Sequence, residues 1–483
     1  MKIAIISDIH APGGNPENPQ IRGELAEMLL LRVINRLNRW IKPDLAIICG
    51  DLVEGNDNVV SRLWLEKIRE ILEKLACPYI AVRGNHDPSE DYFYKVFQRK
   101  EQVDIRGTRF LVFDDRQEPG FNASRSESQI ARFKHARANF DGAIISVQHV
   151  PLFEPGTSDC PYNYLNAEEI ISEMRSQKIF MSISGHYHKG MGHVQSGGIN
   201  FIASPAISEM PFKYMIIETD GEKVSTSKDC LQMPVELGLV DRHVHTQLAY
   251  CSENMEAGLI MKLHKDMGLA DIVFTEHSGQ LYFEDNPFWT GECYKNGLAG
   301  LNKKHNRMER YFKLMEENNV PKKSIGLEVD FDYAGRAMIK PEDKSRVSFL
   351  IGSLHKLAEM WKEKVDWQAV RQEYLFRTEA ILKSGVDVLA HPFRMFHRKG
   401  GEMPVDLYEK VIKMLKKYKV AAEINFHSQE AESDFAKMCI ESGVKLSLSS
   451  DCHNMYELGE LWPHLQMLSK LGVAKEELKK ILL

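Results

Sequence analysis

The stretch YIAVRGNHD at residues 79–87 decides the class of fold for the first half of the chain. Its apolar residues 79–82 predict a short buried strand, which leads at once into Gly84, Asn85, His86 and Asp87. Polar residues directly after a buried strand lie at its carboxyl end, where α/β sheets place their ligands. We therefore expect a functional site at this strand end.

Four other apolar runs in the first half also end in residues that bind metals. Residues 2–7 precede Asp8 and His10, residues 44–49 precede Asp51, residues 143–147 precede His149, and residues 179–183 precede His186 and His188. Amphipathic stretches at residues 24–40 and 62–75 separate the early runs. The alternation predicts an α/β layered domain.

The donor types in this half suit a pair of divalent metals that share one carboxylate. Asp51 is the natural shared ligand. One metal is expected at Asp8, His10 and His188, and the other at Asn85, His149 and His186. His86 would be left free of the two metals.

The order Asp-x-His, Gly-Asp, Gly-Asn-His-Asp, single His and Gly-His-x-His over residues 1–230 resembles the calcineurin-like metallophosphoesterase family. The resemblance implies a four-layer αββα domain that holds two divalent metals, manganese or iron, which activate water for in-line attack on phosphorus. It also implies catalytic roles for Asp51 and His86. The histidine stabilises the transition state or protonates the leaving oxygen.

Residues 229–239 contain Cys230, Pro234 and Gly238 and show no clear periodicity, so we place the linker there. The expected domains are residues 1–232 and 238–483. A length of 483 residues agrees with two domains of ordinary size.

A second series of strand ends begins after residue 239, and its seven apolar segments again finish in polar donors. These donors are His243 and His245, Glu276 and His277, Glu328 and Asp330, His355, His391, Asn425, and Asp451 and His453. Segments of helical period, such as residues 367–383 and 407–418, fall between them. Seven strand–helix units predict a parallel barrel with its site at the carboxyl ends of the strands. Imidazoles outnumber carboxylates, which favours zinc, manganese or iron.

This second pattern resembles the polymerase-and-histidinol-phosphatase (PHP) family, a distorted (βα)7 barrel that commonly holds three metals. The resemblance carries ligand roles over to His243, His245, His277, Glu328, His355, His391, Asp451 and His453. We nominate Glu253 as a ninth ligand. The family often has Asp-His where this chain has Glu276-His277. Arg394 is expected to hold a substrate phosphate, because a guanidinium matches phosphate geometry.

Composition narrows the possible partners. A net charge of −6 argues against strong non-specific binding to nucleic acids. The eight cysteines include no Cys-x-x-Cys pair, so they indicate neither a disulfide framework nor a zinc finger. The first residues do not form a signal peptide and no apolar run is longer than a strand, so we expect a cytoplasmic protein with no membrane partner.

We predict a bifunctional metal-dependent phosphoesterase in which one domain hydrolyses phosphodiesters and the other phosphomonoesters. The expected substrate is a phosphorylated small molecule, a nucleotide, a short oligonucleotide or a nucleic-acid end. One alternative is a pair of independent metabolite phosphatases, with histidinol phosphate suggested by the second family. Another is that one domain is a non-catalytic sensing module, which predicts that metal ligands are missing.

Overall fold

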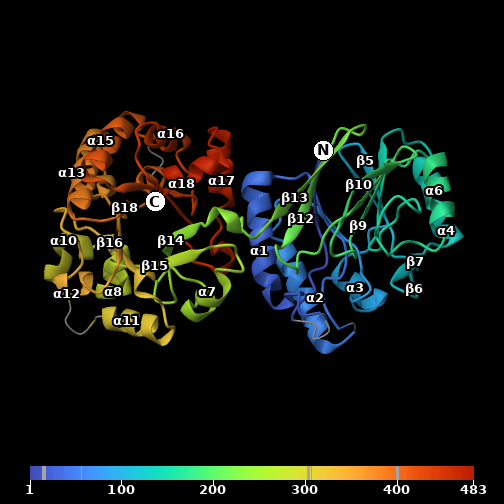
Figure 1. The fold of residues 1–483 in the computed structure, drawn as a ribbon, viewed down its shortest axis with the longest axis horizontal. Helices are drawn as coiled ribbons and strands as arrows, with labels where there is room; N and C mark the ends of the chain where they lie inside the picture. Colours follow the sequence, from blue (N-terminus) through green and yellow to red (C-terminus); the bar gives the residue numbers. More distant parts are fainter. Residues whose placement is uncertain (14–17, 56, 302–304, 306, 399–401) are drawn as a thin grey trace. The chain divides into compact units, whose positions relative to one another are not determined.

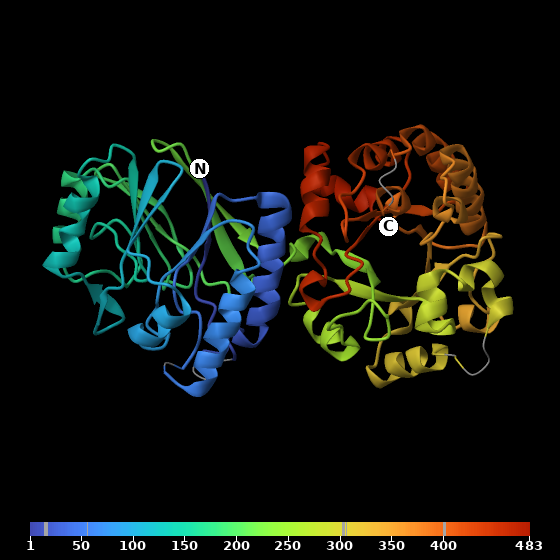
Figure 2. The same cartoon turned by 180° about the vertical axis from the view of Figure 1, so that it is seen from behind.

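The computed structural model describes residues 1–13, 18–55, 57–301, 305, 307–398 and 402–483. The chain divides into two compact units, Met1–Gln232 and Met233–Leu483, which we call the first and second domains (Figures 1 and 2). Residues from Met233 onward, in the predicted linker, belong to the second unit. The backbone N–H of Met233 donates to the carbonyl of Met267 at 2.9 Å.

Two β-sheets form the centre of the first domain. The five-stranded sheet has the order β13 (Val224–Cys230), β12 (Lys213–Thr219), β1 (Lys2–Ile6), β2 (Leu45–Ile48) and β3 (Tyr79–Ala81). The six-stranded sheet has the order β10 (Met191–Ser196), β11 (Ile199–Ala203), β9 (Met181–Ser184), β8 (Ala143–Val147), β5 (Thr108–Val112) and β4 (Gln102–Ile105). The strands that precede the predicted ligands are parallel to one another within each sheet, whereas β12 is antiparallel to β1.

Alternating residues of each strand pack on opposite faces of these sheets. Ile145 joins Ile5 and Ile47 in the core between the two sheets. Its neighbour Ile144 faces the other way, into a core that includes Phe133 of α5 (Arg132–Arg137) and Ile170 of α6 (Ala167–Ser176). Helices α1 (Ala26–Arg36) and α2 (Val59–Leu72) pack with the five-stranded sheet (Figure 1). The predicted αββα architecture is confirmed.

The second domain is a parallel barrel of seven strands. Their order is β14 (Val240–Val244), β15 (Asp271–His277), β16 (Ile325–Asp330), β17 (Phe349–Ser353), β18 (Val388–Leu389), β19 (Ala421–Asn425) and β20 (Leu446–Ser449). A parallel bridge between Val244 and Cys452 links the first strand to the end of the last. Helices between the strands include α11 (Met308–Glu317), α13 (Trp367–Lys383) and α15 (Tyr408–Tyr418). The predicted distorted (βα)7 barrel is confirmed.

All eight cysteines are free thiols. Within the described ranges, none of the helices has both the length and the apolar character that a membrane crossing requires.

Candidate metal centres

The backbone is strained at several of the strand ends that carry predicted ligands. In the first domain φ is 55° at Asp8, 51° at Asp51 and 64° at His186. In the second domain φ is 28° at His391 and 53° at Asp451. Residues other than glycine rarely adopt this left-handed region, and such strain gathers at functional sites.

Two glycines allow the strand ends of the first domain to approach closely. A Cβ atom on Gly84 would lie 2.2 Å from Oδ1 of Asp51, and one on Gly185 would lie 1.8 Å from Oγ of Ser7. No side chain fits at either position. Gly84 therefore allows the ends of the neighbouring strands β2 and β3 to approach, and Gly185 allows the ends of β9 and β1, which belong to different sheets, to approach.

Asp8, His10 and His188 form one group of donors in the first domain. Nε2 of His10 lies 3.2 Å from Nε2 of His188, which lies 3.6 Å from Oδ1 of Asp8. On the outer side, Nδ1 of His10 donates to Glu54 at 2.6 Å, and Nδ1 of His188 donates to Glu209 at 2.7 Å. A carboxylate can only accept, so these bonds place the proton on Nδ1 and leave the lone pair of each Nε2 facing the other.

Asp51, His149 and His186 form a second group. Nδ1 of His149 donates to the carbonyl of Cys49 at 2.6 Å, which leaves its Nε2 facing Oδ2 of Asp51 at 3.2 Å. Nε2 of His186 donates to the carbonyl of Phe121 at 3.0 Å. Its Nδ1 then faces Nε2 of His149 at 3.1 Å. The nitrogen and oxygen atoms of these three side chains again converge on one point.

Asp51 lies between the two groups. Oδ2, which faces His149, is also 3.9 Å from Nε2 of His10, and Oδ1 accepts the backbone N–H of His86 at 2.8 Å. Oδ1 of Asn85 is 3.0 Å from Nε2 of His149. The structure thus brings every site residue predicted for the first domain to one place, and their individual roles stay predictions.

His86 differs from its neighbours in both environment and charge. Its side chain is 31% exposed, and its Nδ1 lies 3.1 Å from Oε1 of Glu54. This hydrogen bond, assisted by the charge of Asp51, raises the pKa of His86 to about 9. The other carboxylate oxygen of Glu54 binds His10. One acidic side chain therefore holds a predicted ligand and the protonated histidine together.

Glu328 is the centre of the cluster in the second domain. Oε1 lies 3.0 Å from Nε2 of His391 and 3.2 Å from Nε2 of His355, and Oε2 lies 3.5 Å from Nε2 of His243. Burial opposes ionisation, but the surrounding histidines, led by His277, hold the pKa of Glu328 well below its usual value. Oε2 also lies against Nδ1 of His277, yet neither atom has a hydrogen-bond partner among the described residues.

Asp451 is a second point of convergence in the barrel. Its Oδ1 lies 3.1 Å from Nε2 of His245 and 3.3 Å from Nε2 of His243. Its Oδ2 pairs with Nη2 of Arg394 at 2.5 Å. A further group of donors that could hold a metal consists of His245, His277 and His453.

Acidic residues contact Nδ1 of several barrel histidines, the ring nitrogen that points away from the centre of the cluster. Nδ1 of His243 donates to Glu423 at 2.7 Å, and Nδ1 of His355 donates to Asp330 at 2.7 Å. Nδ1 of His245 lies 3.2 Å from Oε1 of Glu276. Through this contact Glu276 orients the ring of His245, a predicted ligand.

Glu276 and Asp330 are among the strand-end donors predicted from the sequence, but the outer acids Glu54, Glu209 and Glu423 were missed. A usable signal exists for Glu423, which stands inside the otherwise apolar run 420–424. A charged residue inside a buried strand is rare unless it is paired. Nothing comparable marks Glu54 or Glu209, because each lies in a loop after its strand, where the sequence has no regular period.

The donor sets fit divalent metals. Buried imidazole nitrogens that face one another at 3.1–3.2 Å repel unless a proton or a metal cation lies between them. In addition, Oδ1 of Asp8 is buried without a hydrogen-bond partner among the described residues. Mixed carboxylate and imidazole donors, with acids behind the imidazoles, are typical of divalent metal sites.

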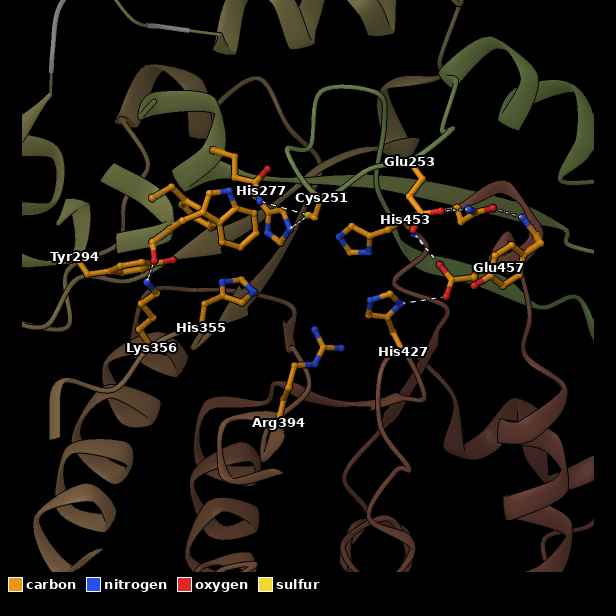
Figure 3. Close-up of a pocket in the computed structure, with 15 residues that line it drawn as sticks. Cys251, Glu253, His277, Tyr294, His355, Lys356, Arg394, His427, His453 and Glu457 are labelled. Atoms are coloured by element: carbon orange, nitrogen blue, oxygen red, sulfur yellow. Dashed lines mark hydrogen bonds and ion pairs between the residues drawn. The ribbon is translucent and has the colours of Figure 1, made fainter. Parts of the chain in front are cut away.

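A cavity of about 280 Å³ opens at the cluster of the second domain (Figure 3). Arg394 reaches this cavity and is almost fully buried, and its Nε has no hydrogen-bond partner among the described residues. Glu253 also lines the cavity, but it is exposed and its Oε2 accepts from Asn454 at 2.6 Å. The structure therefore places Glu253 at the rim instead of among the buried donors, and its ligand role stays a prediction.

Comparison with known proteins matches both halves of the chain. Residues 1–190 match the model of calcineurin-like phosphoesterases, and residues 241–427 match that of the PHP domain. A "probable cyclic nucleotide phosphodiesterase" of Xenorhabdus bovienii is 25% identical over 166 residues, which are 32% of this chain and 65% of that protein. A protein of the same description from Synechococcus is 25% identical over 239 residues, 46% of this chain and 89% of its own length.

A solved dimetal phosphatase of Danio rerio aligns with 47% of this chain and 96% of its own, at 17% identity and a TM-score of 0.41. This chain spans just under two thirds of the Xenorhabdus relative, at 65%.

The two family-model matches support a hydrolase of phosphoric esters, and the two donor clusters could hold divalent metals. A domain that matches the calcineurin-like phosphoesterases and a domain that matches the PHP family are joined in this chain. The predicted family resemblances are confirmed.

Proposed function

We propose that the first domain hydrolyses a phosphodiester and that the second hydrolyses a phosphomonoester, both of nucleotides or short nucleic-acid ends. The observation that carries this proposal is the presence of two complete but different clusters. The first combines an aspartate that lies between two donor groups with His86, a half-buried histidine whose pKa is raised. The second combines many imidazoles with an arginine that reaches a cavity.

In the first domain, two metals, manganese or iron, would be held by Asp8, His10 and His188 and by Asn85, His149 and His186, with Asp51 shared. When bound, such metals polarise the phosphoryl group and lower the pKa of water. His86 supplies the proton for the leaving oxygen. Since Glu54 binds its Nδ1, the Nε2–H of the imidazolium is the group that can donate.

Aromatic side chains beside the first cluster support a nucleotide substrate. Phe121 follows β6 (Arg116–Glu118) and precedes β7 (Asn122–Ser124), and it is 54% exposed. Its ring centroid lies 6.3 Å from that of His186 and 6.1 Å from that of Tyr162. An exposed aromatic ring can stack on a nucleobase. The cyclic nucleotide phosphodiesterase names of the two relatives agree with this proposal.

In the second domain, up to three metals, of zinc, manganese or iron, would be held by the eight carried-over ligands. Arg394 supports a monoester substrate, because a terminal phosphate carries more charge than a diester and offers more oxygens to a guanidinium. The Nη2 of Arg394 is engaged by Asp451 and Asn425. The guanidinium N–H groups other than those of Nη2 would bind a phosphate oxygen.

Hydrolysis of a cyclic nucleotide, followed over time by chromatography, tests the proposal. The parent protein should yield nucleoside and inorganic phosphate. A variant without the second cluster should stop at the nucleoside monophosphate, and one without the first cluster should leave the cyclic nucleotide intact. Complete conversion by the variant that lacks the second cluster would refute the division of labour.

A further inference from the structure

We propose that the thiol of Cys251 is a metal ligand of the second domain and takes the place assigned from the sequence to Glu253. The inference rests on the proposed metal centre of that domain and adds a sulfur donor to it. Cys251 follows β14, and its side chain lines the cavity between His277 and His453 (Figure 3).

The first observation is the distance from sulfur to imidazole. Sγ of Cys251 lies 3.6 Å from Nε2 of His277. Zinc–sulfur bonds of about 2.3 Å and zinc–nitrogen bonds of about 2.0 Å, at a tetrahedral angle, place the two ligand atoms roughly 3.5 Å apart. The spacing is therefore that of two ligands of one ion.

A second observation concerns the buried nitrogens around the same point. The His277 side chain is 7% exposed, and its Nδ1 lies against Oε2 of Glu328, so Nε2 is the nitrogen that faces Cys251. His453 donates from Nδ1 to the carbonyl of Asp451 at 2.8 Å, so its Nε2 is the nitrogen with the lone pair. His245, His277 and His453 bring one donor atom each within 4.8 Å of one another. Cys251 adds sulfur beside this nitrogen-rich group.

Gln280 is oriented to support a thiolate. Its Oε1 accepts the backbone N–H of Tyr250 at 2.5 Å, which fixes the orientation of the amide. Nε2 must then point to Sγ of Cys251, which lies 3.5 Å away. A donor aimed at the sulfur stabilises the negative charge that metal binding creates there.

Glu253 lacks these features, since it is exposed and bonded to Asn454. When a divalent metal binds, the Cys251 thiol would release its proton to solvent and the sulfur would bind through its lone pair. A thiolate ligand favours zinc over magnesium or manganese, because sulfur is a soft donor.

Cobalt-loaded full-length protein tests the inference without an activity assay. A thiolate bound to Co²⁺ gives an intense sulfur-to-metal charge-transfer absorption in the near ultraviolet. We expect this absorption in the parent and in Cys439→Ala, a control that removes a thiol from α16 (Ser433–Glu441). It should be absent in Cys251→Ser and present in Glu253→Gln.

Alkylation gives a second measurement on the parent protein alone. The peptide that contains Cys251 should resist iodoacetamide in the metal-loaded protein and react after chelation, as shown by mass spectrometry. Full cobalt occupancy of the second domain without the charge-transfer absorption, or equal alkylation in both states, would overturn the assignment of Cys251. Failure of the second domain to bind cobalt at all would instead overturn the proposed metal centre.

Discussion

Glu54 accepts a hydrogen bond from His86, with Oε1 and Nδ1 3.1 Å apart. The bond fixes the ring and raises the pKa of His86 to about 9. The histidine is therefore charged at neutral pH and can act as a proton donor, while its neighbours face inward as candidate ligands.

Replacing His86 by alanine should lower diester turnover by roughly 10²- to 10⁴-fold, as expected for loss of a general acid or a charge stabiliser. Metal content, measured by mass spectrometry, should stay at the parental level. His135→Ala, which changes an exposed histidine of α5, is the matched control. Parental turnover in His86→Ala would remove His86 from the mechanism.

Asp51→Asn should abolish diester hydrolysis while the monoesterase activity persists. The carboxylate lies between the two donor groups of the first domain, and an amide supplies one acceptor oxygen and no charge. Separate assays with a cyclic nucleotide and a nucleoside monophosphate provide the measurement. Loss of both activities together would contradict independent sites.

The double variant Asp451→Asn, His453→Ala should lose part of the metal bound in the second domain. The parent is expected to hold about five metals per chain, from a two-metal and a three-metal site. The variant should hold clearly fewer and lose the monoesterase step, yet cleave the diester at the parental rate. Retention of full stoichiometry would show that these two residues are not ligands.

Glu423→Gln tests whether an acid that hydrogen-bonds two predicted ligand residues strengthens metal binding. One oxygen of Glu423 accepts from Nδ1 of His243 at 2.7 Å, and the other accepts the backbone N–H of His391 at 2.6 Å. Glutamine has only one acceptor oxygen, so one donor would face an amide N–H. We expect the metal affinity of the second domain to fall roughly 10- to 100-fold in competition with a chelator. Glu409→Gln, an exposed change on α15, should have no effect.

His464 predicts a pH dependence of folding that is independent of the metals. Its Nε2 donates to the carbonyls of Ile424 and Ser449, and burial lowers its pKa to about 4. The unfolded chain binds a proton near pH 6.5 and the folded chain does not. Stability therefore falls as the pH drops from about 6.5 to about 4, by roughly 3 kcal/mol in total.

Denaturant unfolding of the chelated protein at several pH values measures this effect. His464→Gln keeps a donor for the carbonyls but does not titrate, so its free energy of unfolding should depend less on pH in that window. Equal slopes for the parent and the variant would rule out His464 as the source.

Much of the fold was readable from local patterns. Apolar runs such as residues 44–49 and 179–183 are short, buried and followed by polar residues, so strands and their carboxyl ends can be located from the sequence. Since parallel strands end at one edge of a sheet or barrel, residues such as Asp51 and His149 had to come together. The sequence by itself therefore determined both fold classes and the set of residues brought together in the first domain.

Only the tertiary structure decided which acidic side chains hydrogen-bond the predicted ligands and which thiol lies beside the second cluster. Glu54, Glu209 and Cys251 lie in loops, where neither a period of two nor of 3.6 specifies the direction of a side chain. Glu253 and Cys251 are two residues apart, yet one is exposed at the rim and the other contacts His277. Only the path of the loop after β14, fixed by contacts far away in the sequence, separates them.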